Sequence, residues 1–275
     1  MRVVRVLSRN ADFQRFGVLS SNRNKRHRMG AFVVEGVRNL NGADAFGWTI
    51  EAFLYAQGRS LSRWAQGMIE THADAIRYEL SPELMDEISA KDESSELMAI
   101  VAMRAPHPET LLDAPNPLLA LFDRPSNRGN LGTIIRSCDA LGVGGLILTG
   151  HGVDPYDPEV VTATMGSLFN VPVIPVFENQ ALQAFFGEAR QKHPGFQVLG
   201  TSAHAEKAIC ACDLTRPTLF MIGNETDGLA PNLRALCDDL AMIPMAQDSY
   251  ATSLNVACAA SILFSAARAQ RISNP

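Results

Sequence analysis

The sequence of 275 residues lacks several features that would place it in a class of proteins at once. It has no run of about 18 uncharged apolar residues, so we expect no transmembrane helix. The N-terminal segment is charged but has no apolar stretch of the kind found in secretory signals. Its five cysteines show no spacing typical of a metal site. These absences predict a cytoplasmic protein with reduced thiols and no metal.

Glycine-rich nucleotide-binding signatures are missing as well. We find neither the G-x-G-x-x-G of dinucleotide-binding proteins nor the Lys-Ser/Thr pair of the P-loop. A nucleotide-dependent dehydrogenase on a doubly wound sheet is therefore disfavoured. With 47% hydrophobic residues, the chain is long enough to bury a core without disulfides or metals, in one large domain or two small ones.

Positive charge is scarce overall but concentrated near the N-terminus. The formal net charge is −5, which by itself argues against a general nucleic-acid binder. Residues 1–38, the basic leader, nevertheless hold nine Lys and Arg against two acids, a net +7, so the remaining residues carry −12. Arg23, Lys25, Arg26 and Arg28 form a dense cationic stretch that we predict to bind RNA phosphates. The alternative is a solvated charged loop.

Four prolines within residues 106–117 mark a boundary between two domains. Proline lacks an N–H donor and disfavours helix in the preceding residue, so we predict an extended linker there. Residues 1–105 alternate short apolar runs with helical segments, which predicts a small α/β domain. In residues 118–275, helical stretches separate most of the apolar strand candidates, which predicts a mostly parallel sheet covered on both faces. Those candidates are residues 118–122, 145–149, 171–176, 196–200, 218–222 and 240–243.

Polar residues follow the first of these strands, in residues 126–136. The apolar spacing beyond them predicts a helix with one buried face, with Asn130 as its N-cap and Gly142 just after its end. Arg136 lies inside this helix, near its buried edge. The alternative interpretation is an ordinary capped helix with a surface arginine.

Two further polar clusters follow later strands. Glu225 comes just after the strand that ends at Gly223, and ligands of open α/β sheets bind outside the carboxyl ends of strands. In the third cluster, Ser253 is the predicted cap of a long C-terminal helix over residues 254–271, and Asn255 lies near its start. The alternatives are a strand-to-helix turn with a solvated acid, and plain helix capping.

Taken together, the three clusters resemble the SpoU class of SPOUT methyltransferases. The matching motifs are N-x-G-x-I-x-R at 130–136, I-G-N-E-x-x-G-L at 222–229, and I-P-M at 243–245 followed by S-L-N-x-A at 253–257. Upstream, F-V-V-E-G at 32–36 is similar to the family's ribosomal-protein-like RNA-binding domain. The resemblance covers almost the whole chain, and residues 22–38 and 121–142 are especially similar to rRNA methyltransferases of this class.

The resemblance implies an enzyme that transfers a methyl group from S-adenosylmethionine to a ribose 2′-hydroxyl of RNA, with rRNA favoured over tRNA. It implies a homodimer whose RNA-binding domain spans residues 1–105 and whose methyltransferase domain spans residues 118–275, with a trefoil knot. Short side chains in the last helix suit close packing at the dimer interface. A tRNA methyltransferase, or a non-catalytic RNA-binding protein with the same fold, is the alternative.

The same resemblance implies roles for individual residues. Those implied to contact the donor are Thr201, Ile222, Gly223, Ile243, Met245, Ser253 and Leu254. Arg136 is the implied catalytic residue, with Asn130 and Glu225 orienting it and with Ser253 and Asn255 holding the ribose or the donor. Because arginine stays protonated in proteins, we expect Arg136 to hold the ribose or phosphate and stabilise the forming alkoxide. The group that accepts the hydroxyl proton is left open.

Overall fold

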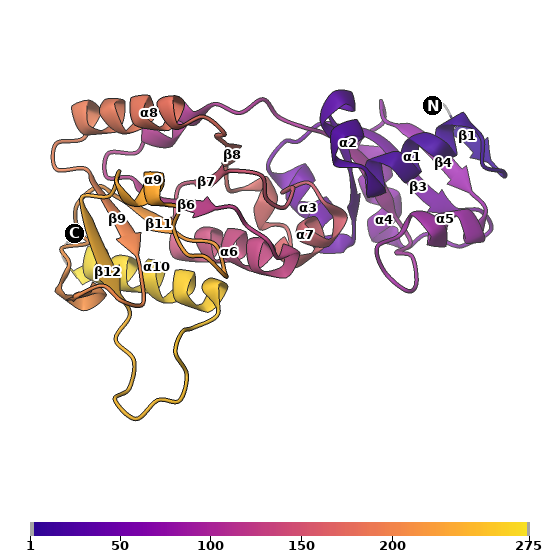
Figure 1. The fold of residues 1–275 in the computed structure, drawn as a ribbon. Coiled ribbons are helices and arrows are strands. Elements are labelled where there is room, and N and C mark those ends of the chain that lie inside the picture. The colour runs from indigo at the N-terminus through magenta and orange to yellow at the C-terminus, as the bar shows by residue number, and fades with distance from the viewer. Residues whose placement is uncertain (1–2, 274–275) are drawn as a thin grey trace. The chain divides into compact units, whose positions relative to one another are not determined.

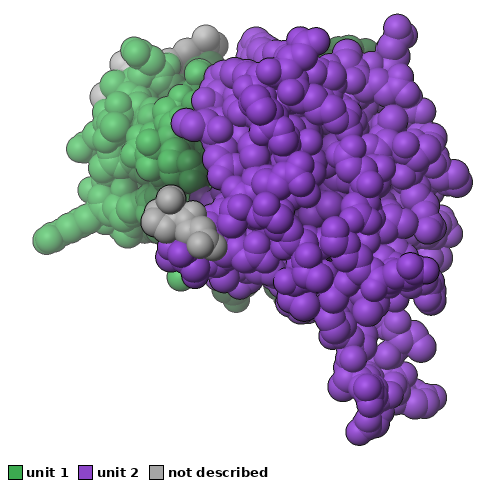
Figure 2. All heavy atoms as spheres, turned by 90° about the vertical axis from the view of Figure 1, so that its left-hand side faces the viewer, with its two compact units in different colours: residues 1–105, 154–170 green, residues 106–153, 171–275 purple. Residues whose placement is uncertain are grey.

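The computed structural model describes residues 3–273, which form two compact units (Figure 1, Figure 2). The first unit comprises residues 3–105 together with Asp154–Asn170. The second comprises Pro106–Val153 and residues 171–273. Arg2, which was counted in the basic leader, lies outside the described residues.

A mixed sheet of five strands, in the order β1-β4-β3-β5-β2, forms the centre of the first unit. Strands β1 (Val3–Val6), β4 (Ile76–Leu80) and β3 (Ile50–Ala56) run parallel. Strand β5 (Met98–Ala102) pairs antiparallel with β3 and with β2 (Ala31–Glu35). The helices preceding residue 105 are α1 (Ala11–Ser21), α2 (Arg23–Met29), α3 (Val37–Ala45), α4 (Arg63–Thr71) and α5 (Pro82–Ile88). The predicted small α/β domain is therefore present.

The cationic stretch of the leader is helical, not a loop. Asn22 ends α1 and caps α2, because its side-chain oxygen accepts a hydrogen bond from the Lys25 backbone N–H at 3.0 Å. Gly30 closes α2 in the left-handed conformation that glycine adopts without steric cost.

Arg26 departs from the phosphate-binding prediction, because its side chain is buried with a relative exposure of 1%. Its guanidinium pairs with the Asp154 carboxylate at 2.9 Å and donates to the backbone carbonyls of Leu19 and Ser20 at the end of α1, at 3.0 Å each. All of these partners lie inside the first unit. A guanidinium enclosed in this way is occupied and cannot reach an RNA phosphate, so Arg26 has a structural role.

Asp154–Asn170, which the sequence groups with the second domain, packs into the first unit. The segment forms α7 (Pro158–Thr164) and the short 3₁₀ helix η2 (Ser167–Phe169). The Trp48 indole N–H donates to the Phe169 carbonyl at 2.9 Å, and both rings pack edge to face. These contacts join segments 121 residues apart, which periodicity cannot reveal.

The second unit is built on a seven-stranded sheet in which every pair is parallel, where the sequence predicted a mostly parallel one. The strand order is β10-β12-β9-β11-β6-β7-β8. The strands are β6 (Leu118–Asp123), β7 (Leu146–Thr149), β8 (Val173–Pro175), β9 (Gln197–Thr201), β10 (Lys207–Ala208), β11 (Thr218–Ile222) and β12 (Asp239–Met242). The two-residue strand β10 gives no recognisable pattern in the sequence.

Helices cover both faces of this sheet, which explains why its strands are apolar on both sides (Figure 1). Helix α8 (Asn179–Lys192) buries Phe185 and Phe186 in a core with Leu119, Leu121 and Leu219 of the sheet. On the opposite face lie α6 (Arg128–Leu141) and α10 (Val256–Ser273), and Phe264 of α10 packs near Phe220. Burying one such phenyl ring stabilises the fold by about 1.5–3 kcal/mol.

Shorter elements complete the second unit: η1 (Pro108–Leu112), η3 (Ile209–Ala211) and α9 (Pro231–Arg234). The expectation of a fully extended linker over residues 106–117 is wrong for η1. Leu111 and Leu112 are buried in the core beneath α8. Burial of these two leucines outweighs the extended preference that the flanking prolines impose.

Two predicted helix caps are corrected. The N-cap of α6 is Asn127, whose side-chain oxygen accepts from the Asn130 N–H at 2.9 Å, so Asn130 lies within the first turn. The cap of α10 is Asn255, which accepts from the N–H groups of Ala257 at 2.9 Å and Cys258 at 3.3 Å, and not Ser253. Gly142 does end α6 in the left-handed conformation, as predicted.

Candidate active site

A cavity of about 930 Å³ opens at the carboxyl ends of three adjacent strands of the second unit, β9, β11 and β12. Its walls come from residues 201–204, 222–229 and 240–243, which end or follow these strands, and from the segment 252–256 that leads into α10. Backbone groups at strand ends are no longer engaged in the sheet ladder and can bind a ligand. The cavity therefore lies where the sequence predicts a ligand.

The residues proposed for donor binding all line this cavity: Thr201, Ile222, Gly223, Ile243, Met245, Ser253 and Leu254. Thr201 is fixed by its hydroxyl, which donates to the Met221 carbonyl on the neighbouring strand at 3.0 Å. Gly223 is required by close packing, since a Cβ there would lie 2.3 Å from the Leu229 nitrogen. The backbone of the second motif thus folds back on itself at the cavity wall.

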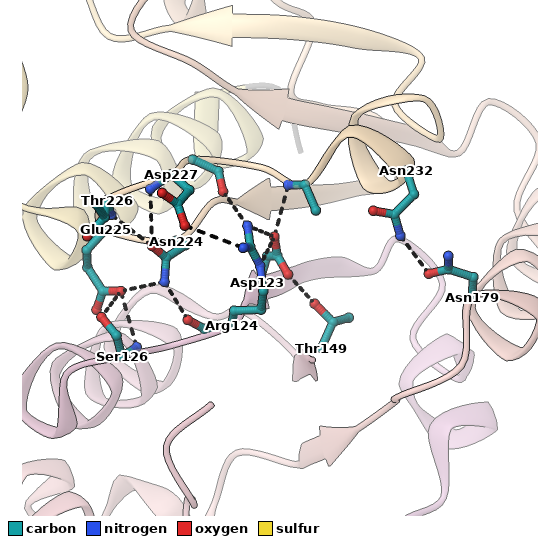
Figure 3. Close-up of polar contacts among 12 residues, drawn as sticks. Asp123, Arg124, Ser126, Thr149, Asn179, Asn224, Glu225, Thr226, Asp227 and Asn232 are labelled. Carbon is teal, nitrogen blue, oxygen red and sulfur yellow. Dashed lines mark hydrogen bonds and ion pairs between the residues drawn. The ribbon is translucent and has the colours of Figure 1, made fainter. Parts of the chain in front are cut away.

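Glu225 ties the second motif to the first. Its carboxylate accepts hydrogen bonds from the Ser126 hydroxyl at 2.7 Å and the Ser126 N–H at 3.2 Å (Figure 3). It also accepts from the Asn127 N–H at 3.3 Å. The Asn130 side-chain amide donates to the same carboxylate at 3.2 Å. Glu225 therefore holds the loop before α6 and the first turn of that helix against the cavity.

Asn130 extends this network to the third motif. Its side-chain oxygen accepts from the Asn255 side-chain amide at 3.1 Å, and Asn255 in turn caps α10. The hydrogen-bonded series Glu225–Asn130–Asn255 therefore connects three segments that are far apart in the sequence. All three residues line the cavity.

The network also determines the protonation of Glu225. Partial burial disfavours the carboxylate, but hydrogen bonds from Ser126, the Glu225 backbone and Asn130 favour it more strongly, so the pKa of Glu225 is lowered from 4.5. The group is therefore an ionised hydrogen-bond acceptor at neutral pH. A carboxylate in this state orients its donors and is a poor proton acceptor.

The sequence analysis missed a second polar cluster, centred on Asp123 at the end of β6 (Figure 3). The buried Asp123 carboxylate accepts from the Thr149 hydroxyl and the Ala230 N–H, both at 3.0 Å, and pairs with Arg124 at 3.0 Å. Arg124 also donates to the Gly228 carbonyl at 3.1 Å. Asp123 and Arg124 thus support the far side of the loop that carries Glu225. The sequence feature that could have indicated this cluster is an acidic residue at the end of an apolar strand.

Arg136 does not join the cavity. It lies exposed on α6, away from the buried edge where the sequence placed it, and it is absent from the cavity walls. Among residues 3–273, its guanidinium makes no hydrogen bond or ion pair. The structure therefore brings together Asn130, Glu225, Ser253 and Asn255, and leaves Arg136 outside the group.

Within residues 3–273, no cluster of three or more His, Cys, Asp or Glu side chains is placed to hold a metal ion. No helix among these residues combines the length and hydrophobicity needed to cross a membrane.

Comparison with known families agrees with this architecture. Residues 117–265 match the SpoU rRNA Methylase family, and residues 10–99 match the SpoU L30e-like domain. The protein belongs to the SpoU rRNA methylase family. The small N-terminal α/β domain and the parallel sheet are those expected from the sequence.

Individual relatives cover nearly the whole chain. The chain is 41% identical over 273 residues to a 23S rRNA (uridine(2479)-2'-O)-methyltransferase of Streptomyces viridochromogenes, which spans 98% of this chain and 93% of that protein. The crystal structure of AviRb from the same organism in complex with AdoMet matches with a TM-score of 0.89 and 40% identity, over 97% of this chain and 100% of that one. An AdoMet-bound rRNA methyltransferase from Sinorhizobium meliloti matches at 0.84 and 28%, over 97% and 98%.

Proposed function

We propose that this protein transfers the methyl group of S-adenosylmethionine to a ribose 2′-hydroxyl of 23S rRNA. The observation that carries the proposal is the cavity at the carboxyl edge of the second sheet, where the Glu225–Asn130–Asn255 series joins all three motifs. The 23S rRNA substrate and the donor follow from the relatives, which span nearly the full chain.

The cavity residues suit S-adenosylmethionine. A volume of about 930 Å³ is ample for a nucleoside with an amino-acid tail, and Ile222, Leu240 and Ile243 offer apolar surface beside polar strand ends. When bound, this donor supplies an electrophilic methyl group on a sulfonium, so the chemistry needs no metal. We assign Thr201, Gly223, Met245, Ser253 and Leu254 to holding the donor, together with Ile222 and Ile243.

The remaining residues of the site are assigned to positioning. Glu225 and Asn130 hold the loop before α6, and Asn255 fixes the start of α10, so the cavity walls stay aligned. Methyl transfer is in-line, and alignment of the reacting groups supplies much of the rate. Arg136 is assigned to holding the acceptor ribose or its phosphate.

Residues 1–105 are proposed as the RNA substrate-binding domain, residues 106–117 as the linker, and residues 118–275 as the methyltransferase domain. Arg23, Lys25 and Arg28 are exposed or partly exposed on α2 and stay proposed phosphate contacts, whereas the buried Arg26 does not. We also propose that the protein is cytoplasmic, because its proposed substrate is rRNA, and that free cysteines such as Cys210 and Cys258 stay reduced there.

We further propose that the protein works as a homodimer. Ala257 and Ala260 pack within their own chain, so the exposed side of α10, with Cys258 and the 41%-exposed Ile262, is the surface available to a partner. A solution mass of twice 29.8 kDa by light scattering is expected, and a monomer would contradict this assignment. The trefoil knot stays a prediction implied by the family.

The direct test of function is methyl transfer from labelled S-adenosylmethionine to a 23S rRNA transcript. We expect label on a ribose, detected as a phosphodiester bond that resists alkaline cleavage after the modified nucleotide. A tRNA transcript serves as the comparison substrate. Label on a base, or transfer to tRNA alone, would overturn the proposal; RNA binding without any transfer would indicate a non-catalytic RNA-binding protein.

Glu225→Gln should impair turnover. The glutamine amide keeps one oxygen acceptor and replaces the other with an NH2 group, which cannot accept from the Ser126 pair of donors or from those of Asn127 and Asn130, so the anchor of the loop before α6 is weakened. By analogy with the loss of one positioned polar group in an active site, we expect kcat to fall about 100-fold. Initial rates with RNA measure the effect. Glu188→Gln, an exposed change on α8, is the matched control, and equal rates for the two variants would contradict the assignment.

The Glu225 carboxylate makes the stability of the fold depend on pH. Because its folded-state pKa is lowered below 4.5, the stability it contributes is fully present above about pH 4.5 and is lost as the pH falls through the folded-state value. We therefore expect the difference in Tm between wild type and Glu225→Gln to be constant near neutrality and to shrink in acid. Thermal melts across this range measure it.

A further inference from the structure

Two exposed rings lie together at the carboxyl edge of the second sheet, outside the cavity. Phe177 follows β8 and is 56% exposed, and its ring stacks on that of the exposed His151, which follows β7. The ring centroids are 6.2 Å apart and the planes are inclined by only 21°. We call His151 and Phe177 the aromatic pair.

The position of the aromatic pair is fixed by the backbone on either side. Val176, just before Phe177, donates its N–H to the Leu148 carbonyl at 2.8 Å and packs against the core, so alternation directs Phe177 outward. On the other side, the Val153 N–H donates to the Pro125 carbonyl at 2.8 Å. The rings of Phe177 and His151 are thus held in place while they stay exposed.

The aromatic pair neighbours the loop that carries the first motif. A Cβ on Gly152 would lie 2.6 Å from the Pro125 ring, and one on Gly150 would lie 2.5 Å from the Arg124 side chain, so residues 150–152 pack directly on residues 124 and 125. Ser126, the next residue, binds Glu225 at the cavity wall. The loop at residues 124–126 therefore contacts both the segment that carries His151 and the Glu225 carboxylate at the cavity wall.

Chemistry favours a nucleic-acid base as the occupant of this surface. An exposed phenyl ring forgoes the free energy that burial would supply, whereas an unpaired base can cover it by stacking. A protein partner would instead be expected to need a broader apolar surface.

We propose that Phe177, supported by His151, stacks on an unpaired base of the RNA strand that carries the acceptor ribose. This inference rests on the proposed function and adds a contact to its RNA substrate. Stacking selects for a splayed, single-stranded segment and is tolerant of base identity. The aromatic pair would therefore hold the strand beside the cavity without reading its sequence.

The test compares Phe177→Ala with Phe177→Tyr on a 23S rRNA transcript. We expect the KM for RNA to rise about 10-fold in Phe177→Ala, with kcat and donor affinity unchanged, because one base stack is lost. Phe177→Tyr keeps the ring and should retain the wild-type KM. An unchanged KM in Phe177→Ala, or an equal rise in both variants, would overturn the inference.

A binding measurement separates this inference from the proposed function. Phe177→Trp adds an indole to the two native tryptophans, Trp48 and Trp64, both of which lie in the first unit. We expect the added emission, relative to wild type, to be quenched by the RNA without any donor present. If wild type methylates the RNA but the added emission does not respond, only the stacking inference fails. If wild type neither binds nor methylates the RNA, both fail.

Discussion

Arg136→Ala should abolish most methyl transfer while leaving the fold and donor binding intact. The side chain is exposed on α6, lies outside the cavity walls and makes no hydrogen bond or ion pair among residues 3–273. Removing it therefore leaves no buried partner unsatisfied, and a surface change of this kind shifts stability by at most about 0.5 kcal/mol. Any large loss of activity must then come from a contact made only with the substrate.

The expected loss in kcat is about 10²- to 10³-fold, the size found for a group that stabilises developing negative charge on oxygen. Arginine suits this task because its planar fork binds phosphate or alkoxide oxygens while staying protonated. Single-turnover rates with RNA measure the loss, and calorimetry with S-adenosylmethionine measures donor affinity.

Two variants control this experiment. Arg136→Lys keeps the charge without the fork and should recover only part of the rate. Arg190→Ala removes an exposed arginine from α8, where it pairs with Asp238 at 3.0 Å, and should leave the rate unchanged. Full activity in Arg136→Ala would refute the role assigned to this residue.

Arg26→Ala should destabilise the first unit by about 3–5 kcal/mol, the cost of leaving one charge of a buried pair without its partner. The Asp154 carboxylate would lose its 2.9 Å ion pair, and the carbonyls of Leu19 and Ser20 would lose their donor. We expect the Tm of the first unit to fall by about 10–20 °C, as measured by calorimetry.

Neighbouring cations on the same helix supply the matched control. Lys25→Ala removes a partly exposed charge and Arg28→Ala an exposed one, and both variants should keep nearly unchanged stability. Each should instead weaken RNA binding and reduce its salt dependence, because each is a proposed phosphate contact. If Arg26→Ala were as stable as these two variants, the buried ion pair would not have the importance assigned to it.

The double variant Arg26→Met with Asp154→Leu distinguishes a missing partner from a damaged helix. Replacing both charges by apolar groups removes the unpaired Asp154 carboxylate, and only the less buried Asp157, 3.7 Å from the Arg26 guanidinium in the wild type, loses a charged partner. Stability should therefore recover much of the loss seen in Arg26→Ala. Stability as low as in Arg26→Ala would show that α2 itself, and not the unpaired carboxylate, is the cause.

Local pattern was sufficient for much of the second unit. The apolar runs near residues 118–122 and 218–222 became β6 and β11, and the alternation with helices predicted a parallel sheet covered on both faces. These features could be predicted because strand propensity, and the end of a helix at a glycine such as Gly142, depend mainly on residues that are close in the sequence. The resemblance of the motifs to SpoU methyltransferases likewise predicted that Glu225 and Asn130 belong to one site.

The local sequence pattern could not decide which of two nearby residues caps a helix. Asn127 and Asn130, three residues apart, are both suitable N-caps for α6. The position of Glu225 decides between them, because its carboxylate accepts from the Asn127 N–H and from the Asn130 side-chain amide. Ser253 and Asn255 present the same ambiguity, which the contact from Asn255 to Asn130 resolves. The aromatic pair was invisible because no periodicity brings His151 to Phe177.

The amino-acid sequence by itself determined the family, because the three motifs and their spacing are those of SpoU methylases. Through that resemblance it also predicted two domains and a set of residues, most of which the fold places around one cavity. It also determined that positive charge gathers in residues 1–38. Only the tertiary structure decided which of those charges is free to meet RNA. Arg26 and Lys25 are adjacent in sequence, but Arg26 is buried because its partner Asp154, 128 residues away, is brought against it by the fold.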